Sequence, residues 1–260
     1  MDPFGSVLTT FALVWAALYA LNVALMFATG LTIEALNRRH PERKIASAPP
    51  TLPRAQEIRR SIGQLAVSSV CLAGGLTLQW HGLGLVDPLA HSWWAVPLML
   101  GVSILCHDCW YYFVHRLMHT RAFYRFHKPH HLSVVPSPWS NDASGTVDTL
   151  LVHGYYLVAP LVLPIPAAAL LVHRVIDGVT SMVGHAGHEH TAGPAGRWPS
   201  PTPSIIFHDL HHSTFRTNFG HYFSIWDRVC GTLHPRYDAK VEEWETRLAT
   251  ARRPGRMPAE

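Results

Sequence analysis

The chain alternates between long apolar runs and short polar segments, a pattern typical of membrane-spanning helices. The first run, Val7 to Leu31, contains no charged residue, and Glu34 is the first charge after it. At 1.5 Å per residue, such a helix can cross a hydrocarbon core of roughly 30 Å. Further apolar stretches run from Ser61 to Val86, from Trp93 to about Val114 and from Thr149 to Val183. The pattern predicts an all-α integral membrane bundle.

The last apolar stretch is too long for one crossing and is broken by Pro160, Pro164 and Pro166. Proline inside a helix removes a backbone donor and clashes with the preceding turn, so we expect two shorter helices that meet there. The bundle should then have about four to five transmembrane helices. Arg174 and Asp177 make the last crossing the least secure.

Composition and charge fit a membrane protein and suggest its orientation. Hydrophobic residues make up 48% of the chain and charged residues only 15%, which is unusual for a soluble domain. Between the first two spans lie Arg38, Arg39, Arg43, Lys44, Arg54, Arg59 and Arg60. Basic loops stay in the cytoplasm, so this segment and the histidine-rich regions should form a cytoplasmic cap. This rule accounts for most of the net charge of +4, and we expect no nucleic-acid partner.

Histidine is the residue type that carries candidate chemistry, with nineteen copies in the chain. His115 and His119 stand four residues apart, which places both imidazoles on one helix face. The pattern His-x-x-His-His occurs twice, at 127–131 and 208–212, and offers three nitrogen donors each time. A further cluster runs from His185 to His190. Imidazole binds iron, copper, zinc and nickel, so these residues predict a metal centre without fixing the metal.

Ten histidines are predicted to bind metal, more than one six-coordinate ion can use, so we expect two ions. They are His115, His119, His127, His130, His131, His185, His188, His208, His211 and His212. His190 is the alternative to His188. Asp108 lies seven residues before His115 on nearly the same stripe, so its carboxylate could accept a proton from a ligand imidazole.

Other histidines receive simpler interpretations. His107 points away from His115 on the helix and is left out of the ligand set. His153 and His173 lie in apolar spans and are expected to make hydrogen bonds between helices. His221 is among the isolated histidines expected to be solvated.

The motifs in this order resemble the fatty acid hydroxylase and sterol desaturase superfamily of membrane di-iron oxidases. The resemblance is carried by Asp108 to His119, Phe126 to His131, His208 to His212 and Trp226-Asp227-Arg228-Val229-Cys230-Gly231-Thr232. Sterol desaturases of this superfamily usually carry histidines where Asp142 and Gly145 stand. That departure favours a lipid hydroxylase, with a lipid or sterol desaturase as the alternative.

The resemblance implies two iron ions that use dioxygen to oxidise a C–H bond of a membrane lipid, although zinc can occupy the same imidazoles in a structure. The catalytic residues would be Asp108, behind a ligand imidazole, and nine histidines that act through the metals: His115, His119, His127, His130, His131, His185, His208, His211 and His212. Electrons must come from an external donor, a ferredoxin or a cytochrome b5-type protein with its reductase, because the chain has no flavin, haem or iron–sulfur motif.

We expect one membrane oxidase domain over residues 1–260. Residues 1–106 would be mainly transmembrane, 107–232 the catalytic region with a helical hairpin, and 233–260 a C-terminal tail, disordered from Arg252. The expected location is a bacterial inner membrane with the histidines on the cytoplasmic side. Alternatives of another class are a membrane metal transporter and a zinc-dependent hydrolase that uses Glu189 as its acid.

Overall fold

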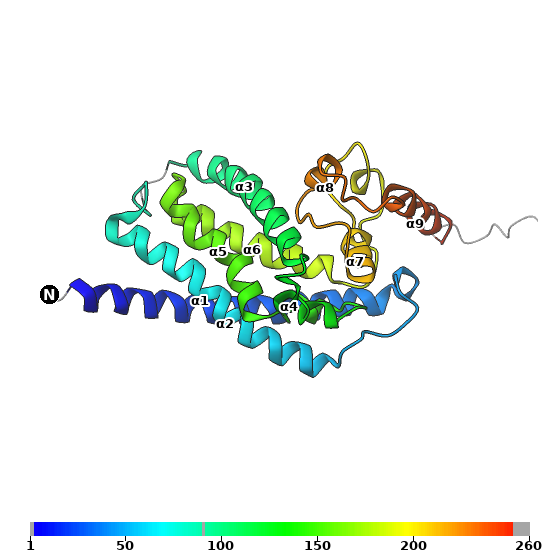
Figure 1. Ribbon diagram of the computed structural model, residues 1–260, viewed down its shortest axis with the longest axis horizontal. Helices are drawn as coiled ribbons and strands as arrows, with labels where there is room; N and C mark the ends of the chain where they lie inside the picture. Colours follow the sequence, from blue (N-terminus) through cyan, green and yellow to red (C-terminus); the bar gives the residue numbers. More distant parts are fainter. Residues whose placement is uncertain (1–2, 90–91, 252–260) are drawn as a thin grey trace, which may run out of the picture.

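The fold is a bundle of long helices with a smaller helical cap at one end (Figure 1). The computed structural model describes residues 3–89 and 92–251; the predicted disordered segment from Arg252 lies outside them. The long helices are α1 (Pro3–Arg39), α2 (Arg54–Leu78), α3 (Ala95–Met118), α5 (Thr146–Val162) and α6 (Ala167–Gly184). The shorter ones are η1 (Pro41–Arg43), η2 (Gln79–Leu83), α4 (Tyr124–His127), η3 (His130–Leu132), η4 (Pro138–Ser140), η5 (Pro194–Gly196), α7 (Ile205–Thr214), α8 (Ile225–Val229) and α9 (Tyr237–Ala251).

Three helices in the described ranges are long and apolar enough to cross a membrane: Phe4–Arg39, Arg54–Leu83 and Ala167–Gly184. The second of them continues from α2 through the π turn η2. α5 is apolar but shorter, at 17 residues. Apart from one isolated bridge between Lys44 and His188, the described residues contain no strand pairing. The predicted all-α membrane fold is confirmed.

The proline-rich stretch divides two helices, as the sequence predicted. α5 ends at Val162 and α6 begins at Ala167, directly after Pro166. Pro160 remains inside the last turn of α5. Because α5 and α6 run in opposite directions, they return the chain to the end of the bundle that it left after α3 (Figure 1).

Close helix packing forms the core of the bundle. α2 packs against α1 and α5, and α6 packs against α1 and α3. Gly75 of α2 lies so near the backbone of α5 that a β-carbon would collide with the carbonyl oxygen of Tyr156. Small residues allow this approach between helices in a membrane. Around the contact, Leu72, Ala73, Tyr156 and Ala159 are buried.

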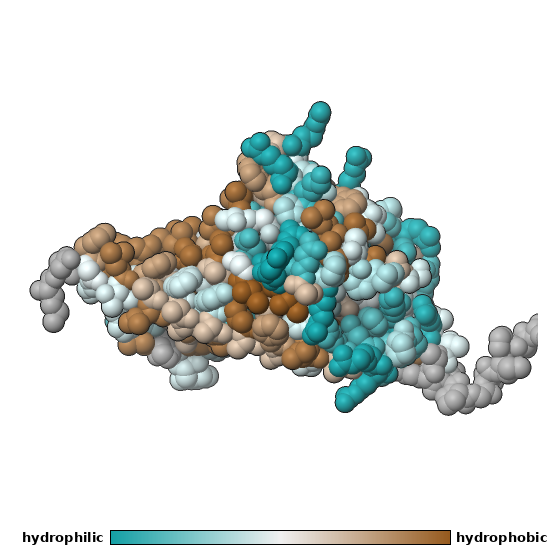
Figure 2. Space-filling model, turned by 90° about the horizontal axis from the view of Figure 1, so that it is seen from below, coloured by the Kyte–Doolittle hydropathy of each residue, from teal (hydrophilic) through white to brown (hydrophobic). Residues whose placement is uncertain are grey.

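The surface of the bundle has two chemically different halves. Hydrophobic side chains cover the half that contains the amino-terminal end of α1, whereas hydrophilic side chains gather over the cap (Figure 2). α1 exposes Leu8, Leu13, Leu21 and Leu31 along its length. Leucines exposed along a whole helix favour contact with lipid, because lipid hydrocarbon then covers side chains that water would otherwise surround.

The predicted C-terminal tail, residues 233–260, contains the helix α9 in its described part. Within it, α9 packs against α7, and Tyr237, Val241, Trp244 and Leu248 are buried. These positions recur at the three- and four-residue spacing of an amphipathic helix. The stripe is hard to see in the sequence because the helix as a whole is polar. α9 therefore supports the helix that carries the second His-x-x-His-His motif.

Candidate metal centre

Five histidines from three segments meet in one place, which we call the five-histidine group. They are His115, His119, His127, His131 and His211, and their ligand nitrogens all lie within 4.8 Å of one another. Nε2 of His131 lies 3.2 Å from Nε2 of His119 and 3.1 Å from Nε2 of His211. The end of α3, the turn around α4 and the last turn of α7 thus converge on a volume the size of one ion.

Four further histidines form a second cluster, the four-histidine group. They are His130, His185, His208 and His212, also within 4.8 Å of one another. Nε2 of His185 lies 2.9 Å from Nε2 of His208, 3.2 Å from that of His212 and 3.3 Å from that of His130. Nine of the ten histidines predicted to bind metal therefore fall into two compact groups.

Each His-x-x-His-His motif contributes to both groups. In the first motif, His127 and His131 enter the five-histidine group and His130 enters the other. In the second, His208 and His212 enter the four-histidine group and His211 enters the first. On a helix such as α7, residues i and i+4 share a face while residue i+3 lies to one side. The motif thereby places donors at two neighbouring centres.

The hydrogen bonds of these rings leave lone pairs that face one another. Nδ1 of His185 donates to the carbonyl of Ser181, and Nδ1 of His211 donates to that of Thr217. A neutral imidazole has one N–H, so Nε2 of each ring carries a lone pair. Nδ1 of His115 likewise donates to the carbonyl of Phe219, and its Nε2 is buried without a hydrogen-bond partner. Converging lone pairs repel unless a cation lies between them, so the residues present fit metal ions.

The surroundings keep the histidines in the neutral form that binds metal. Burial lowers the pKa of His119 to about 3 and that of His185 to about 4. Burial, together with the neighbouring imidazoles, also lowers the pKa of His130, His131 and His212 well below the ordinary value. Neutral imidazole is the ligand form of histidine, so these sites need not lose a proton before a metal binds.

A carboxylate does support a ligand-type histidine, but it is Asp148 rather than Asp108. Nδ1 of His127 lies 2.8 Å from Oδ2 of Asp148, which is buried in the first turn of α5. Asp108 instead accepts hydrogen bonds from the backbone N–H groups of Tyr222 and Phe223. The predicted contact between Asp108 and a ligand imidazole is therefore wrong, because the carbonyl of Phe219 occupies that position beside His115.

The loop that carries this carbonyl is itself held by Asp227. Its two carboxylate oxygens accept from the backbone N–H of Phe219 at 2.9 Å and of Gly220 at 2.7 Å. Asp227 is completely buried. Asp227 of the Trp226-Asp227 pair therefore fixes the loop whose carbonyl orients His115. Sequence spacing did not reveal this link.

His188 lies outside both groups, contrary to its prediction as a ligand. Gly187 adopts a left-handed backbone, φ +66°, and turns the chain so that His188 forms the bridge to Lys44. His190, the predicted substitute, lies with Nε2 2.8 Å from the side-chain oxygen of Asn37. Neither residue reaches the nitrogens that converge at His185.

A third cluster contains His107, Asp177 and His221, whose ligand atoms also lie within 4.8 Å of one another. Asp177 already pairs with Arg174 at 3.3 Å and accepts from His221 at 3.0 Å. Because Arg174 balances the carboxylate charge, this cluster does not require a cation. The side chain of His221 is only 8% exposed, so the expectation that it is solvated is wrong. The hydrogen bond of His173 to Ser103 fits its predicted role between helices.

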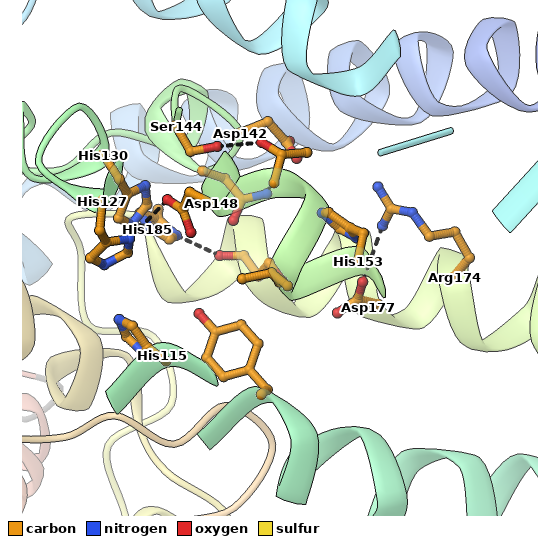
Figure 3. Close-up of a pocket in the computed structure, with 15 residues that line it drawn as sticks. His115, His127, His130, Asp142, Ser144, Asp148, His153, Arg174, Asp177 and His185 are labelled. Atoms are coloured by element: carbon orange, nitrogen blue, oxygen red, sulfur yellow. Dashed lines mark hydrogen bonds and ion pairs between the residues drawn. The ribbon is translucent and has the colours of Figure 1, made fainter. Parts of the chain in front are cut away.

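Two cavities adjoin the histidine groups. One, of about 60 Å³, runs from His115, His127, His130 and His185 toward His153, Arg174 and Asp177 (Figure 3), and we call it the polar cavity. The other, of about 220 Å³, is lined by His185 and His208 and by apolar residues such as Val183, Ile205 and Phe207. Both cavities reach the four-histidine group, so small molecules have room beside it.

The geometry explains why glycine stands at position 145, where the sterol desaturases that the motifs resemble usually carry a histidine. A β-carbon at Gly145 would collide with the carbonyl oxygen of Phe126. A histidine therefore cannot replace Gly145 unless the backbone of α4 at Phe126 moves. Asp142, the other departure, lines the polar cavity.

These features define a helical membrane protein whose cap gathers nine histidines into two groups able to hold metal. The chain belongs to the fatty acid hydroxylase family: the sequence profile of that family matches residues 100–232, which contain both groups. The resemblance inferred from the motifs is thereby confirmed.

Sterol-modifying enzymes are among the relatives. The chain is 26% identical to the Delta(7)-sterol 5(6)-desaturase ERG3 of Saccharomyces cerevisiae, over 71% of this chain and 54% of that protein. It is 35% identical to the lathosterol oxidase of Mus musculus, over 49% of this chain and 42% of that protein. It is 26% identical to methylsterol monooxygenase 1 of Gallus gallus, over 55% of this chain and 51% of that protein. The chain spans about half the length of these relatives. No solved structure matches it.

Proposed function

We propose that this protein is an oxygen-dependent lipid oxidase that holds two iron ions in its two histidine groups. The observation that carries the proposal is the convergence of imidazole lone pairs on two adjacent centres. Bound iron would supply the power to activate dioxygen and oxidise an unactivated C–H bond, which no side chain can do. His115, His119, His127, His131 and His211 would hold one ion; His130, His185, His208 and His212 would hold the other.

The residues around the ligands would fix their geometry. Asp148 would hold His127 in the tautomer that presents Nε2 to the metal, as carboxylates beside metal ligands do. The carbonyls of Ser181, Thr217 and Phe219 would do the same for His185, His211 and His115. Tight helix packing around the cavities would exclude water from the reacting carbon.

Hydroxylation is the preferred reaction, and desaturation is a second candidate because relatives carry both kinds of name. The electron donor would be a ferredoxin or a cytochrome b5-type protein with its reductase. We propose that the histidine cap lies on the cytoplasmic side of a bacterial inner membrane, because the basic residues between the first two apolar stretches adjoin it. Arg60, near the start of α2, donates to the carbonyl of Pro129.

The alternatives of another class find less support. A zinc hydrolase would need a free acid beside the metal, but both oxygens of Glu189 accept hydrogen bonds, one from the backbone N–H of Ile206 at the start of α7. A transporter would need ligands on broken helices near the middle of the membrane, whereas these ligands lie at helix ends and in the cap.

The test uses protein purified without oxygen, loaded with iron and placed in lipid nanodiscs. We expect two irons per chain. With a reduced ferredoxin and ¹⁸O₂, mass spectrometry should find a lipid that has gained one ¹⁸O atom, whereas loss of two hydrogens would indicate desaturation. One zinc per chain and no oxidised lipid under these conditions would reject the proposal. His81→Ala, at an exposed residue far from the groups, is the control.

A further inference from the structure

The lining of the polar cavity is unlike that of a tunnel for a bare hydrocarbon chain. All the described residues that line it have polar or ionisable side chains, except Val152. Lipid and drug sites are mostly apolar with a few polar groups that orient the ligand. Ionisable residues within apolar helices are costly and mark functional sites. Arg174 and Asp177 of α6 meet that description.

The far end of this cavity has unused hydrogen-bonding capacity (Figure 3). Arg174 is buried and makes one hydrogen bond to a described residue, from Nη1 to Asp177 at 3.3 Å. Nδ1 of His153 is buried without a hydrogen-bond partner. Asp142 accepts a hydrogen bond from Asn141 at 3.0 Å and can accept more. Buried groups with spare donors and acceptors are costly unless a ligand or water satisfies them.

The balance of charges selects the kind of ligand. Asp148 lies at the histidine end of the cavity, where it is hydrogen-bonded to His127. At the other end, Asp142 and Asp177 accompany Arg174, the one lysine or arginine among the described lining residues. Because Arg174 already pairs with Asp177, a carboxylate ligand, such as that of a free fatty acid, would meet the charge of Asp142 and is disfavoured. A hydroxyl group carries no charge and can both accept from Arg174 and donate to a carboxylate.

We propose that the polar cavity binds the hydroxyl group of a lipid alcohol. Arg174 donates a hydrogen bond to the hydroxyl oxygen, and Asp142 accepts one from the hydroxyl O–H. This rests on the proposed oxidase function and names its substrate class. The apolar body of the lipid fits the larger cavity, which shares Tyr111, Asn141, Ser181 and His185 with the polar one.

The test measures equilibrium binding to the iron-loaded protein in nanodiscs without reductant. Its probes are two alcohols and their methyl ethers, hexadecanol and lathosterol, together with palmitate and hexadecylamine. An ether can accept but not donate, so the wild type should bind at least one alcohol roughly 10- to 100-fold more tightly than its ether. Palmitate should bind more weakly than hexadecanol because its carboxylate meets the charge of Asp142. Hexadecylamine should also bind more weakly, because its ammonium group cannot accept a hydrogen bond from Arg174.

Variants assign the preference to this cavity. Asp142→Asn and Arg174→Lys keep the size or the charge of the side chain and should reduce the preference for the alcohol to about threefold or less. Glu57→Gln changes a buried carboxylate outside the cavity and should leave the preference intact. Equal binding of alcohols and ethers by the wild type, or tighter binding of the amine, overturns the proposal, as does an unchanged preference in both cavity variants.

Because binding is measured without turnover, the two proposals can fail separately. Selective binding of an alcohol with no oxidised product from any lipid rejects the oxidase function and leaves the alcohol site standing. Oxidation of lipids without selective binding of an alcohol does the reverse. Thermal unfolding of each variant shows whether a lost preference reflects the cavity or a lost fold.

Discussion

The two histidine groups differ in the number of donors and in what surrounds them. The five-histidine group includes His127, which Asp148 supports. The four-histidine group has no carboxylate hydrogen-bonded to its rings in the described structure, and its His185 lines both cavities. With all nine imidazoles bound, a six-coordinate ion would keep one open position in the first group and two in the second. On the proposed function, the first group would hold its metal more firmly, and the second, which adjoins both cavities, would leave more room for reactants.

The largest effects should come from adjacent histidines of α7 that belong to different groups. His211→Ala and His212→Ala should each lower oxidation more than about 100-fold, because loss of a ligand exceeds the effect of losing its support. Each should reduce iron from two atoms per chain toward one, as measured by elemental analysis. His130→Ala should behave like His212→Ala, and His81→Ala like the wild type. Full activity in either α7 variant would contradict the assignment of that group.

Asp148→Asn should sharpen the contrast between the groups. The amide cannot accept a proton from His127 as strongly as a carboxylate, so iron affinity in the five-histidine group should fall about 10- to 100-fold. A chelator should then remove one iron early and the second at the wild-type rate. Asp108→Asn is the matched control, since that carboxylate contacts backbone N–H groups instead. Simultaneous loss of both irons from Asp148→Asn would show that the groups are not independently supported.

Asp227→Asn tests the loop behind the five-histidine group. One of the two backbone N–H groups at Phe219 and Gly220 would face an amide N–H instead of an oxygen, which should destabilise the fold by about 1–3 kcal/mol. Thermal unfolding measures this loss, and oxidation should fall with it as His115 loses its fixed carbonyl. Asp238→Asn, which changes a partly exposed carboxylate that pairs with Arg228 and does not contact Phe219 or Gly220, is the control. An unchanged unfolding temperature for Asp227→Asn would exclude this role.

His188→Ala should have the smallest effect. Because the residue belongs to neither group, iron content should stay at two per chain and oxidation within about twofold of wild type, as expected for surface substitutions. His185→Ala, three residues earlier, provides the contrasting result. Loss of one iron in His188→Ala would return this residue to the ligand set.

The sequence predicted what depends on local periodicity. Long runs without charge located the helices, the prolines between Pro160 and Pro166 located the break, and the spacing of His115 and His119 placed both on one face. The partners of each ring were harder to predict, because they depend on which distant segment lies opposite. A helical wheel aligns Asp108 with His115 but says nothing of the loop at Phe219. Backbone carbonyls leave no mark in a sequence, and Gly187 redirects His188 through its backbone alone.

The length of α1 sets the height of the cap. Its 37 residues extend about 55 Å, which is much longer than the thickness of a hydrocarbon core, roughly 30 Å. Near its carboxyl end, Asn37 donates to the carbonyl of Ala186, the residue after His185. One end of α1 is thus apolar enough to lie in the membrane, and the other end is hydrogen-bonded beside His185. If the protein oxidises a lipid as proposed, the number of turns in α1 would set the depth at which the lipid carbon meets the histidine groups.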